Sequence, residues 1–429
     1  MPRSKATSTP DRRTHLQNPR YRFIGGKGGV GKTTCAAAMG IVSARRGRRT
    51  LIISTDPAPS LGDALGQRLG RKPRGVRAVR RLEAVEVDAS AALERWVAAR
   101  RSTLESIALR GTWLDRDDVS RLLRLSLPGI DEIAGLLEIA DLGSNPRYDQ
   151  VIVDTAPTGH LLRMLGMPAV LEKVAEVFDH MQAKHRVIVH ALRGRWTPDA
   201  ADALIEQIDR QARETSALLR DPSRAAVSWV TLPEPMSVEE TADAIGWLRE
   251  QGMFVDAVVV NRLTTPPPQA CRWCSARRRV ERQAIPDLGR ARALRGIPIL
   301  QVPASSREPR GIAALAALGG RLERPRRAVA RGRPAAPARV AAHLTLAGSS
   351  PVEGVTGLIA PAEARLVMFG GKGGVGKTTC ATAMALAIAT ASPDRRVLLL
   401  STDPAHSVGD ALGQELSDAA RHLHGGPVN

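Results

Sequence analysis

Short apolar runs recur along this chain, and longer segments with apolar residues at helical spacing separate them. The short runs predict strands at 22–24, 51–54, 82–87, 151–153, 227–231, 255–260 and 302–303. The longer segments predict helices at 32–44, 90–145, 160–220 and 238–251, with an interruption at Pro128-Gly129. Because strands and helices alternate, the pattern predicts an α/β fold with a doubly wound, mostly parallel sheet.

The same pattern divides the chain into four parts. We expect a basic, disordered tail at 1–20 and a domain at 21–319 that carries a helical subdomain at about 90–220. Residues 320–362 are rich in Arg, Pro, Ala and Gly, which is typical of a linker. Residues 363–429 form the fourth part.

That fourth part repeats the beginning of the main domain. The string GGKGGVGKTTC occurs at 25–35 and again at 370–380. Two shorter strings, at 54–60 and 63–67, recur at 401–407 and 410–414 with only one substitution, Pro59 to His406. The repeat predicts a truncated second copy of the domain, since only 69 residues follow Ala360.

Length and charge narrow the class of protein. With 429 residues the chain is long enough for two or three domains, and its net charge is +19. More than half of that charge lies at 1–22 and 321–339, in the expected tail and linker, so we expect no specific nucleic-acid site. A site for another polyanion or for anionic lipid stays an alternative.

Cysteine content and hydropathy indicate the compartment. Four cysteines in the whole chain fit a reducing cytoplasm better than a disulfide scaffold. No apolar run reaches the roughly 18 residues that span a membrane, and the N-terminal residues lack the apolar core of a secretory signal. We expect a cytoplasmic protein that associates with membranes peripherally at most.

Candidate chemistry begins with the lysines. The chain has eight, and four of them, Lys27, Lys32, Lys372 and Lys377, lie in the repeated string. The spacing Gly26-x-x-x-x-Gly31-Lys32-Thr33 matches the phosphate-loop pattern of P-loop NTPases. Backbone N–H groups of such a loop surround phosphate oxygens, and the following helix presents its positive end to them. Glycine-rich turns also occur by chance, but two copies, each after an apolar strand and before a helix, argue against that.

The pattern therefore predicts binding of ATP and Mg²⁺. Lys32 is expected to reach the β- and γ-phosphates, the Thr33 hydroxyl to hold Mg²⁺, and Thr34 to contact the α-phosphate. The remaining phosphate-binding residues are predicted to be Gly26, Lys27, Gly28, Gly29, Val30 and Gly31.

Two aspartates follow predicted strands. Asp56 follows the strand at 51–54, where a carboxylate could position or deprotonate the attacking water. Asp154 ends the strand at 151–153, where a carboxylate usually supports Mg²⁺. Since phosphoryl transfer depends mainly on positioning and charge neutralisation, these few groups suffice for hydrolysis. The alternative for either residue is a helix N-cap.

The string DTAPTGH at 154–160, followed by LLR, resembles the switch II signature of the ArsA-type ATPases. These comprise the arsenite-pump ATPases and the ATPases that target tail-anchored membrane proteins. Residues 54–60 resemble their switch I, and 128–132 and 258–262 also match. The resemblance covers about 21–320 and 365–416.

The resemblance assigns further roles. It implies that Lys27 reaches a nucleotide across a dimer interface and that Asp56 positions the attacking water. It also implies that Asn261 reads the adenine and that Pro303 belongs to the loop packing on that base. Pro59 departs from the family's usual histidine, which the second copy keeps as His406.

Cys271 and Cys274 form a separate pair in a Pro-rich, then Arg-rich region. They supply two zinc ligands, whereas a closed structural site needs four, so two chains on a twofold axis could share one Zn²⁺. Such a shared four-thiolate zinc site is similar to that of the ATPases that target tail-anchored proteins. A free reduced pair is the alternative. Residues 90–220 contain no cysteine that could bind arsenite.

Taken together, the sequence predicts an ATPase that couples opening and closing of a dimer to a membrane-protein client or a membrane-pump subunit. The dimer would be a homodimer or an intrachain pseudo-dimer. The alternative functions are those of an arsenite-efflux ATPase, a DNA-partition-type ATPase and a nucleotide-binding scaffold that does not hydrolyse ATP. Met164, Met167 and Met181 could hold an apolar helix, although core packing explains them as well.

The second copy is expected to be a poor nucleotide site. It retains Lys372, Lys377, Thr378 and Asp403 but has no counterpart of Asp154, Asn261 or Pro303 within this sequence. Either the chain is the front of a longer tandem protein, or the second copy is vestigial.

Overall fold

The computed structural model describes most of the main domain and parts of the C-terminal segment. The described residues are 19–56, 60–113, 115–122, 130–323, 364–371, 375–391, 396–402, 407–412, 414, 416 and 420–422. Residues 1–18 of the expected N-terminal tail, residues 324–362 of the expected linker, Pro59 and His406 lie outside them.

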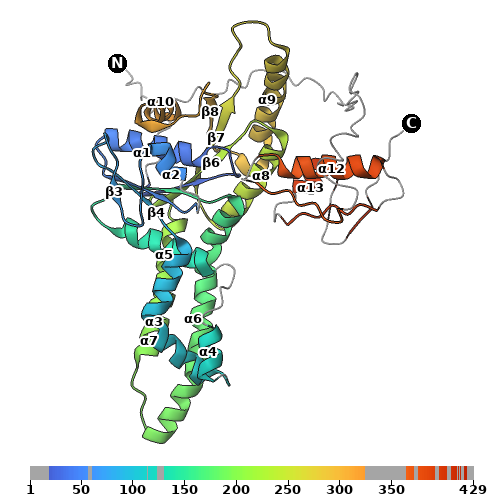
Figure 1. Ribbon diagram of the computed structural model, residues 1–429. Helices are drawn as coiled ribbons and strands as arrows, with labels where there is room; N and C mark the ends of the chain where they lie inside the picture. The colour runs from blue at the N-terminus through green and yellow to red at the C-terminus, as the bar shows by residue number, and fades with distance from the viewer. Residues whose placement is uncertain are drawn as a thin grey trace, which may run out of the picture.

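A single eight-stranded sheet forms the centre of the described part of the main domain (Figure 1). Its strand order is β3-β4-β2-β5-β1-β6-β7-β8. All neighbours run parallel except β3, which is antiparallel to β4 at the edge. The strands are β1 Tyr21–Gly25, β2 Thr50–Ser54, β3 Arg74–Gly75, β4 Leu82–Glu86, β5 Gln150–Asp154, β6 Ala225–Thr231, β7 Val255–Leu263 and β8 Ile299–Pro303. The predicted α/β fold with a mostly parallel sheet is confirmed.

Successive residues of the central strands face opposite layers of helices, as the pleat requires. Phe23 and Val153 pack in a core with α5 (Ile130–Ser144), the start of α6 (Thr158–Arg193) and α8 (Pro235–Glu250). Their neighbours Ile24 and Ile152 pack on the other side, against α1 (Lys32–Arg45) and α10 (Gly311–Glu323). Both faces are covered, which explains why the short strands read as continuous apolar runs.

The remaining helices of the main domain are α2 (Ser60–Leu65), α3 (Ala89–Gly111), α4 (Arg116–Leu122), α7 (Ala200–Arg220), α9 (Arg272–Arg290) and a 3₁₀ turn, η1 (Arg292–Leu294). Helices α3, α4, α6 and α7 project from the sheet as a stalk (Figure 1). The stalk has its own apolar core, to which Leu104, Ile107, Leu171, Leu204 and Ile208 contribute. The stalk therefore packs as a helical unit of its own, attached to the sheet through α5 and α6.

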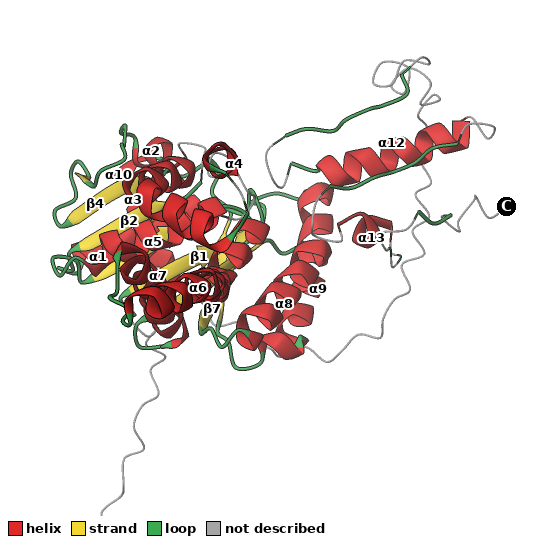
Figure 2. Cartoon of the chain, turned by 90° about the horizontal axis from the view of Figure 1, so that it is seen from below, coloured by secondary structure: helices red, strands yellow, loops and turns green. Residues whose placement is uncertain are grey.

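The C-terminal segment differs from the main domain. Its helices α12 (Lys377–Ala391) and α13 (Ser407–Leu412) pack together, and α13 contacts α8. Figure 2 shows both helices beside α8 and α9. The described residues 366–370 and 397–401 form no strand, although their counterparts in the main domain are β1 and β2. Their apolar side chains, such as Met368 and Leu400, are exposed instead.

The expected truncated second domain is thus not formed by the described residues. In the main domain, β1 lies between β5 and β6, and β2 lies between β4 and β5. Within this sequence the second copy has no counterpart of β5 or β6. A strand without neighbours leaves its backbone groups unpaired, so the local pattern alone does not make a sheet.

Candidate functional site

The predicted site residues come together at the carboxyl ends of neighbouring parallel strands. Asp56 follows β2, Asp154 ends β5, the phosphate loop follows β1, Asn261 lies near the end of β7 and Pro303 ends β8. Because these ends lie along one edge of the sheet, residues far apart in sequence are brought to that edge. Ligands of open α/β sheets bind in the crevice outside the carboxyl ends of the strands.

Two glycines explain the tight path of the phosphate loop. Gly26 has φ +139°, and a Cβ there would lie 2.1 Å from the carbonyl oxygen of Val230. Gly31 has φ +99° and precedes the first residue of α1, and a Cβ there would lie 2.5 Å from the side-chain nitrogen of Asn261. Only glycine fits both the conformation and the space at these positions.

The two lysines of the loop have different partners. The Lys32 side chain is buried and its Nζ donates a 3.2 Å hydrogen bond to the carbonyl oxygen of Lys27. The Lys27 Nζ lies 2.5 Å from Oε1 of Glu240, on α8. Lys32 therefore folds back over the loop, where phosphates would lie, whereas Lys27 points to a neighbouring helix.

The other loop residues keep the arrangement that phosphate binding needs. Gly28 and Val30 are buried, Gly29 is exposed, and Thr33 and Thr34 are half-buried in the first turn of α1. The Thr33 hydroxyl lies 3.3 Å from that of Ser60, the first residue of α2. The phosphate loop thus leads directly into the N-terminus of α1. A helix N-terminus is a favourable position for an anion.

Asp154 is fully buried beneath this loop. Burial raises the pKa of its carboxyl to about 6, and the nearby Asp56 carboxylate adds to the rise. The Thr33 hydroxyl, the Lys32 ammonium and the Ser54 hydroxyl oppose the shift because they favour the charged form. Among the described residues, Oδ1 of Asp154 has no hydrogen-bond partner.

These groups fit Mg²⁺. The ion prefers hard oxygen ligands and keeps several waters, and a buried, unpaired carboxylate oxygen beside the Thr33 hydroxyl offers that chemistry. Bound there, Mg²⁺ would neutralise charge on the β- and γ-phosphates.

Asp56 lies two residues beyond the end of β2 and is half-buried. Its backbone N–H lies 3.4 Å from the Ser54 hydroxyl, which also lies 3.3 Å from Oδ2 of Asp154. Ser54 thus connects the two carboxylate-bearing segments. The role of Asp56 toward water stays a prediction, since residues 57–59 lie outside the described part.

Asn261 is directed toward the phosphate loop. Its Nδ2 donates a 2.8 Å hydrogen bond to the carbonyl oxygen of Val30, and its Oδ1 accepts one of 2.9 Å from the N–H of Arg262. A register shift between β7 and β8 falls between Val260 and Leu263, and Arg262 has φ +59°. The irregularity explains the direction of the Asn261 side chain. Its predicted contact with adenine, and that of Pro303, stay predictions.

The first turn of α6 bears a charged cluster that the sequence did not suggest. His160 and Arg163 both lie 3.3 Å from Oε1 of Glu132, in the first turn of α5. Glu132 is largely buried and belongs to the string 128–132, most of which lies outside the described residues. The cluster connects the switch II segment to the stalk.

Two residues near the site, Glu132 and Glu240, were not among those predicted from the sequence. Glu132 lay in a quoted motif, whereas nothing marked Glu240.

The cysteine pair lies at the start of α9. Cys271 caps this helix, because its Sγ accepts a 3.3 Å hydrogen bond from the N–H of Cys274. This hydrogen bond lowers the pKa of the Cys271 thiol. The hydrogen bond between the two side chains raises the pKa of the Cys274 thiol. No group of three or more His, Cys, Asp or Glu suited to a metal exists among the described residues. The pair therefore fits zinc only with ligands from elsewhere, such as a second chain.

The second copy adds little to the described site. Lys377 and Thr378 begin α12, as Lys32 and Thr33 begin α1. Lys372 and Asp403 lie outside the described residues.

The described part of the chain contains no membrane-spanning helix, because none of its helices has the length and apolar character to cross a bilayer.

Comparison with known proteins identifies the family. The family model described as anion-transporting ATPase matches residues 19–324 and 364–426. An "ATPase GET3" of Podospora anserina is 32% identical over 277 residues, which cover 63% of this chain and 80% of the relative. An "ATPase GET3" of Malassezia globosa is 30% identical over 312 residues, covering 71% and 91%. An "ATPase ASNA1 homolog 1" of Paramecium tetraurelia is 29% identical over 282 residues, covering 63% and 83%. With its phosphate loop, buried Asp154 and family match over most of its length, the chain belongs to the ArsA/GET3 family of anion-transporting ATPases and is an ATPase.

Proposed function

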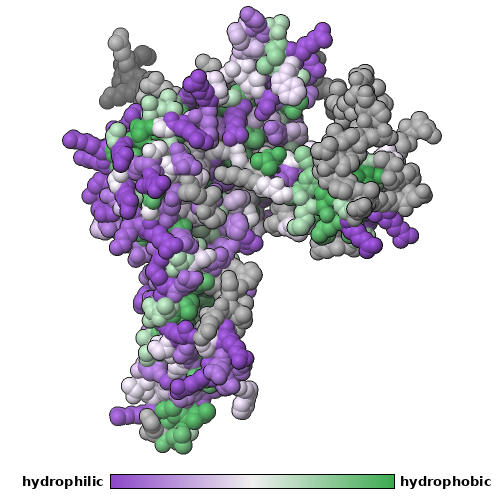
Figure 3. Space-filling model, in the orientation of Figure 1, coloured by the Kyte–Doolittle hydropathy of each residue, from purple (hydrophilic) through white to green (hydrophobic). Residues whose placement is uncertain are grey.

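We propose that this ATPase uses a dimer opening and closing cycle to handle a membrane-protein client. The observation that carries the proposal is a set of exposed apolar side chains at the tip of the stalk. Val187, Ile188 and Leu192, in the last two turns of α6, are each more than half exposed. Figure 3 shows hydrophobic residues gathered at this tip. Exposed apolar groups at one place favour contact with an apolar partner.

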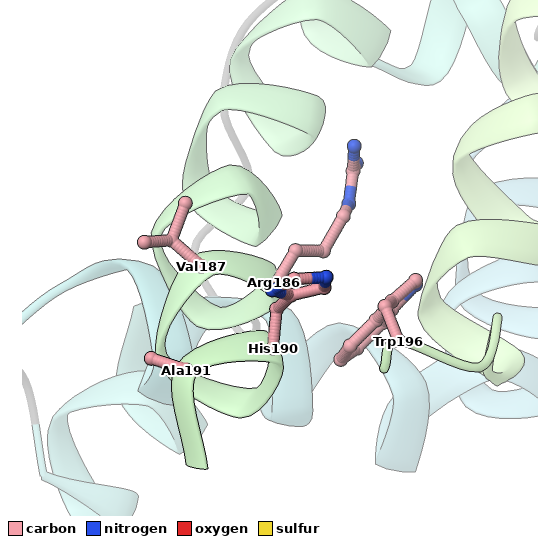
Figure 4. Close-up of a pocket in the computed structure, with 5 residues that line it drawn as sticks. All are labelled: Arg186, Val187, His190, Ala191 and Trp196. Carbon is pink, nitrogen blue, oxygen red and sulfur yellow. The ribbon is translucent and has the colours of Figure 1, made fainter. Parts of the chain in front are cut away.

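A shallow hollow of about 460 Å³ lies beside these residues, lined by Arg186, Val187, His190, Ala191 and Trp196. Figure 4 shows Trp196, from the loop before α7, across from His190 of α6. The Trp196 ring also packs edge-on against His185, with 5.7 Å between the ring centroids. An aromatic ring beside aliphatic groups suits an apolar side chain of a client helix.

The remaining parts of the proposal follow the site. ATP and Mg²⁺ bind in the crevice, Lys32 and Asp56 support hydrolysis, and Lys27 acts across the dimer. Two Cys271–Cys274 pairs hold one Zn²⁺ between subunits of a homodimer. The protein works in the cytoplasm and reaches membranes through its client.

Client binding is tested with a peptide that carries a C-terminal apolar helix. The full chain should protect such a peptide from aggregation, and the double substitution Ile188→Asp with Leu192→Asp should abolish the effect while ATP turnover persists. A matched control is Glu172→Gln with Glu176→Gln, on the same helix nearer the sheet. Equal protection by the tip variant and the wild type would refute the client site.

An arsenite-efflux ATPase is the second candidate. The match of the family model to 364–426 as well as 19–324 favours it, because a tandem layout suits a pump-driving pseudo-dimer. The absence of cysteine from 90–220 opposes direct metalloid binding. Stimulation of ATP turnover by arsenite, with no response to apolar peptides, would favour the pump over the client.

A further inference from the structure

Of the two lysines in the phosphate loop, Lys32 folds back over the loop and Lys27 forms an ion pair with Glu240. The two side chains are only 31% and 16% exposed, and Nζ and Oε1 are 2.5 Å apart. The pair joins the phosphate loop to α8, across 213 residues of sequence. A half-buried ion pair is screened less by solvent than one on the surface, so its geometry affects what Lys27 can do.

Glu240 is held in place by its helix. The hydroxyl of the next residue, Thr241, donates a 2.6 Å hydrogen bond to the carbonyl oxygen of Ser237 and lies 2.9 Å from the hydroxyl of Thr231, at the end of β6. Trp229 of β6 donates a 3.2 Å bond to the Thr241 hydroxyl. All of these groups are buried, so they fix this turn of α8 against the sheet.

The same tryptophan touches the switch II helix. A Cβ on Gly25 would lie 2.6 Å from the Trp229 ring and 2.8 Å from Leu161, so the three residues meet at one point. Leu161 lies in the first turn of α6. Through Trp229, the turn of α8 that carries Glu240 is therefore linked to both the base of the phosphate loop and the first turn of α6.

We propose that Glu240 is the positioning residue of Lys27. Its carboxylate holds the ammonium away from the crevice while no nucleotide is bound, and the phosphates of ATP must displace it to engage the lysine. One cation cannot satisfy two anions at full strength, so the pair opposes ATP binding by the free energy needed to break it. The inference rests on the proposed role of Lys27 as a phosphate ligand, whether in its own subunit or across a dimer.

The test is the Kd of a fluorescent ATP analogue for the full chain with Mg²⁺. Glu240→Gln keeps the size of the side chain and removes its charge. We expect the Kd to fall about three- to tenfold, the effect of losing a partly buried ion pair. Glu239→Gln, at the exposed neighbouring position, changes the same charge and should leave the Kd within about twofold of the wild type.

A double-mutant cycle separates the pair from a general charge effect. In a Lys27→Ala background, Glu240→Gln should no longer tighten binding, since the lysine it restrains is gone. An unchanged Kd in the single variant, or the same fall with and without Lys27, would overturn the proposal. A merely structural role of Glu240 would lower the melting temperature without tightening ATP binding. If the wild type bound and hydrolysed no ATP, the assignment of the site would fail instead, which is a distinguishable result.

Discussion

The side-chain amide of Asn261 donates a 2.8 Å hydrogen bond to the carbonyl oxygen of Val30. This bond joins the end of β7 to the phosphate loop, 231 residues earlier in the chain. Both residues are at least nine-tenths buried. The loop is therefore held from the side on which the nucleotide base is expected, before any nucleotide binds.

Replacing Asn261 with alanine should loosen the loop. The Val30 carbonyl would lose its partner in a buried place, which costs about 1–3 kcal/mol of folding free energy. We expect a lower melting temperature and roughly tenfold weaker ATP binding, measured by thermal unfolding and nucleotide titration. Arg262→Gly is the control, because glycine keeps the N–H and adopts φ +59° without strain. An unchanged melting temperature in Asn261→Ala would contradict this role.

Hydrolysis should require Lys32 and Asp56 in different ways. Lys32→Ala removes the cation that folds over the loop, so ATP turnover should fall by about 100-fold or more. Asp56→Asn should bind ATP normally and stall hydrolysis, since its carboxylate is expected to act on water. Steady-state turnover and nucleotide titration separate the two, with the exposed Lys72→Ala as control. Turnover like that of the wild type in both variants would remove these residues from the site.

Asp154 makes the stability of the nucleotide-free protein depend on pH. Burial raises its pKa from 3.8 to about 6, so the folded state binds a proton between these pH values that the unfolded state has released. The contribution of Asp154 to the free energy of unfolding is therefore fully present below about pH 4 and is lost as the pH rises through 6. Asp154→Asn avoids the buried charge and should stabilise the protein by about 3 kcal/mol at pH 7.5.

Thermal unfolding of both proteins in metal-free buffer checks this expectation. The advantage of Asp154→Asn should shrink as pH approaches 4, because the wild-type carboxyl is then protonated. Mg²⁺ with ATP should stabilise the wild type more than the variant, since the ion binds the carboxylate. A variant that is less stable than the wild type at pH 7.5 would show that the carboxylate is paired rather than poised for a metal.

Zinc should bind at about one ion per two chains. Cys271→Ser should lower both the metal content, measured by elemental analysis, and the stability of the dimer, measured by mass in solution. Cys380→Ser is the control, because that thiol is exposed and lies outside the pair. A metal-free dimer that is indifferent to Cys271→Ser would refute the shared site.

Removal of residues 345–429 should leave ATP turnover within about twofold of the full chain. All residues assigned to phosphate, Mg²⁺ and water lie within the main domain, and the described C-terminal residues contain helices but no strand. Turnover and mass in solution test this. A stable, active dimer of the shortened chain supports a vestigial second copy, whereas loss of turnover would show that the segment is required, as in an intrachain pseudo-dimer.

Local sequence determined much of this protein. Apolar runs such as 51–54 and 151–153 fixed the strands to within one residue of β2 and β5, because a strand buried on both faces must be apolar throughout. The phosphate loop was readable because its chemistry needs glycines, Lys32 and Thr33 at fixed spacing. The repeat at 370–380 was equally clear, yet the described residues before and after it form no strand, since a strand also needs neighbours.

Only the tertiary structure decided which residues act on one another. Glu240 is one of many glutamates in the sequence, and only the packing of α8 on β6 brings it to Lys27. Asn261 turns toward Val30 because of an irregularity between β7 and β8, which depends on how two distant strands pair. The raised pKa of Asp154 likewise comes from complete burial beneath the loop. Electrostatic and hydrogen-bonding partners are set by distances of a few ångströms across the fold, whereas sequence pattern reports mainly which faces of each element avoid water.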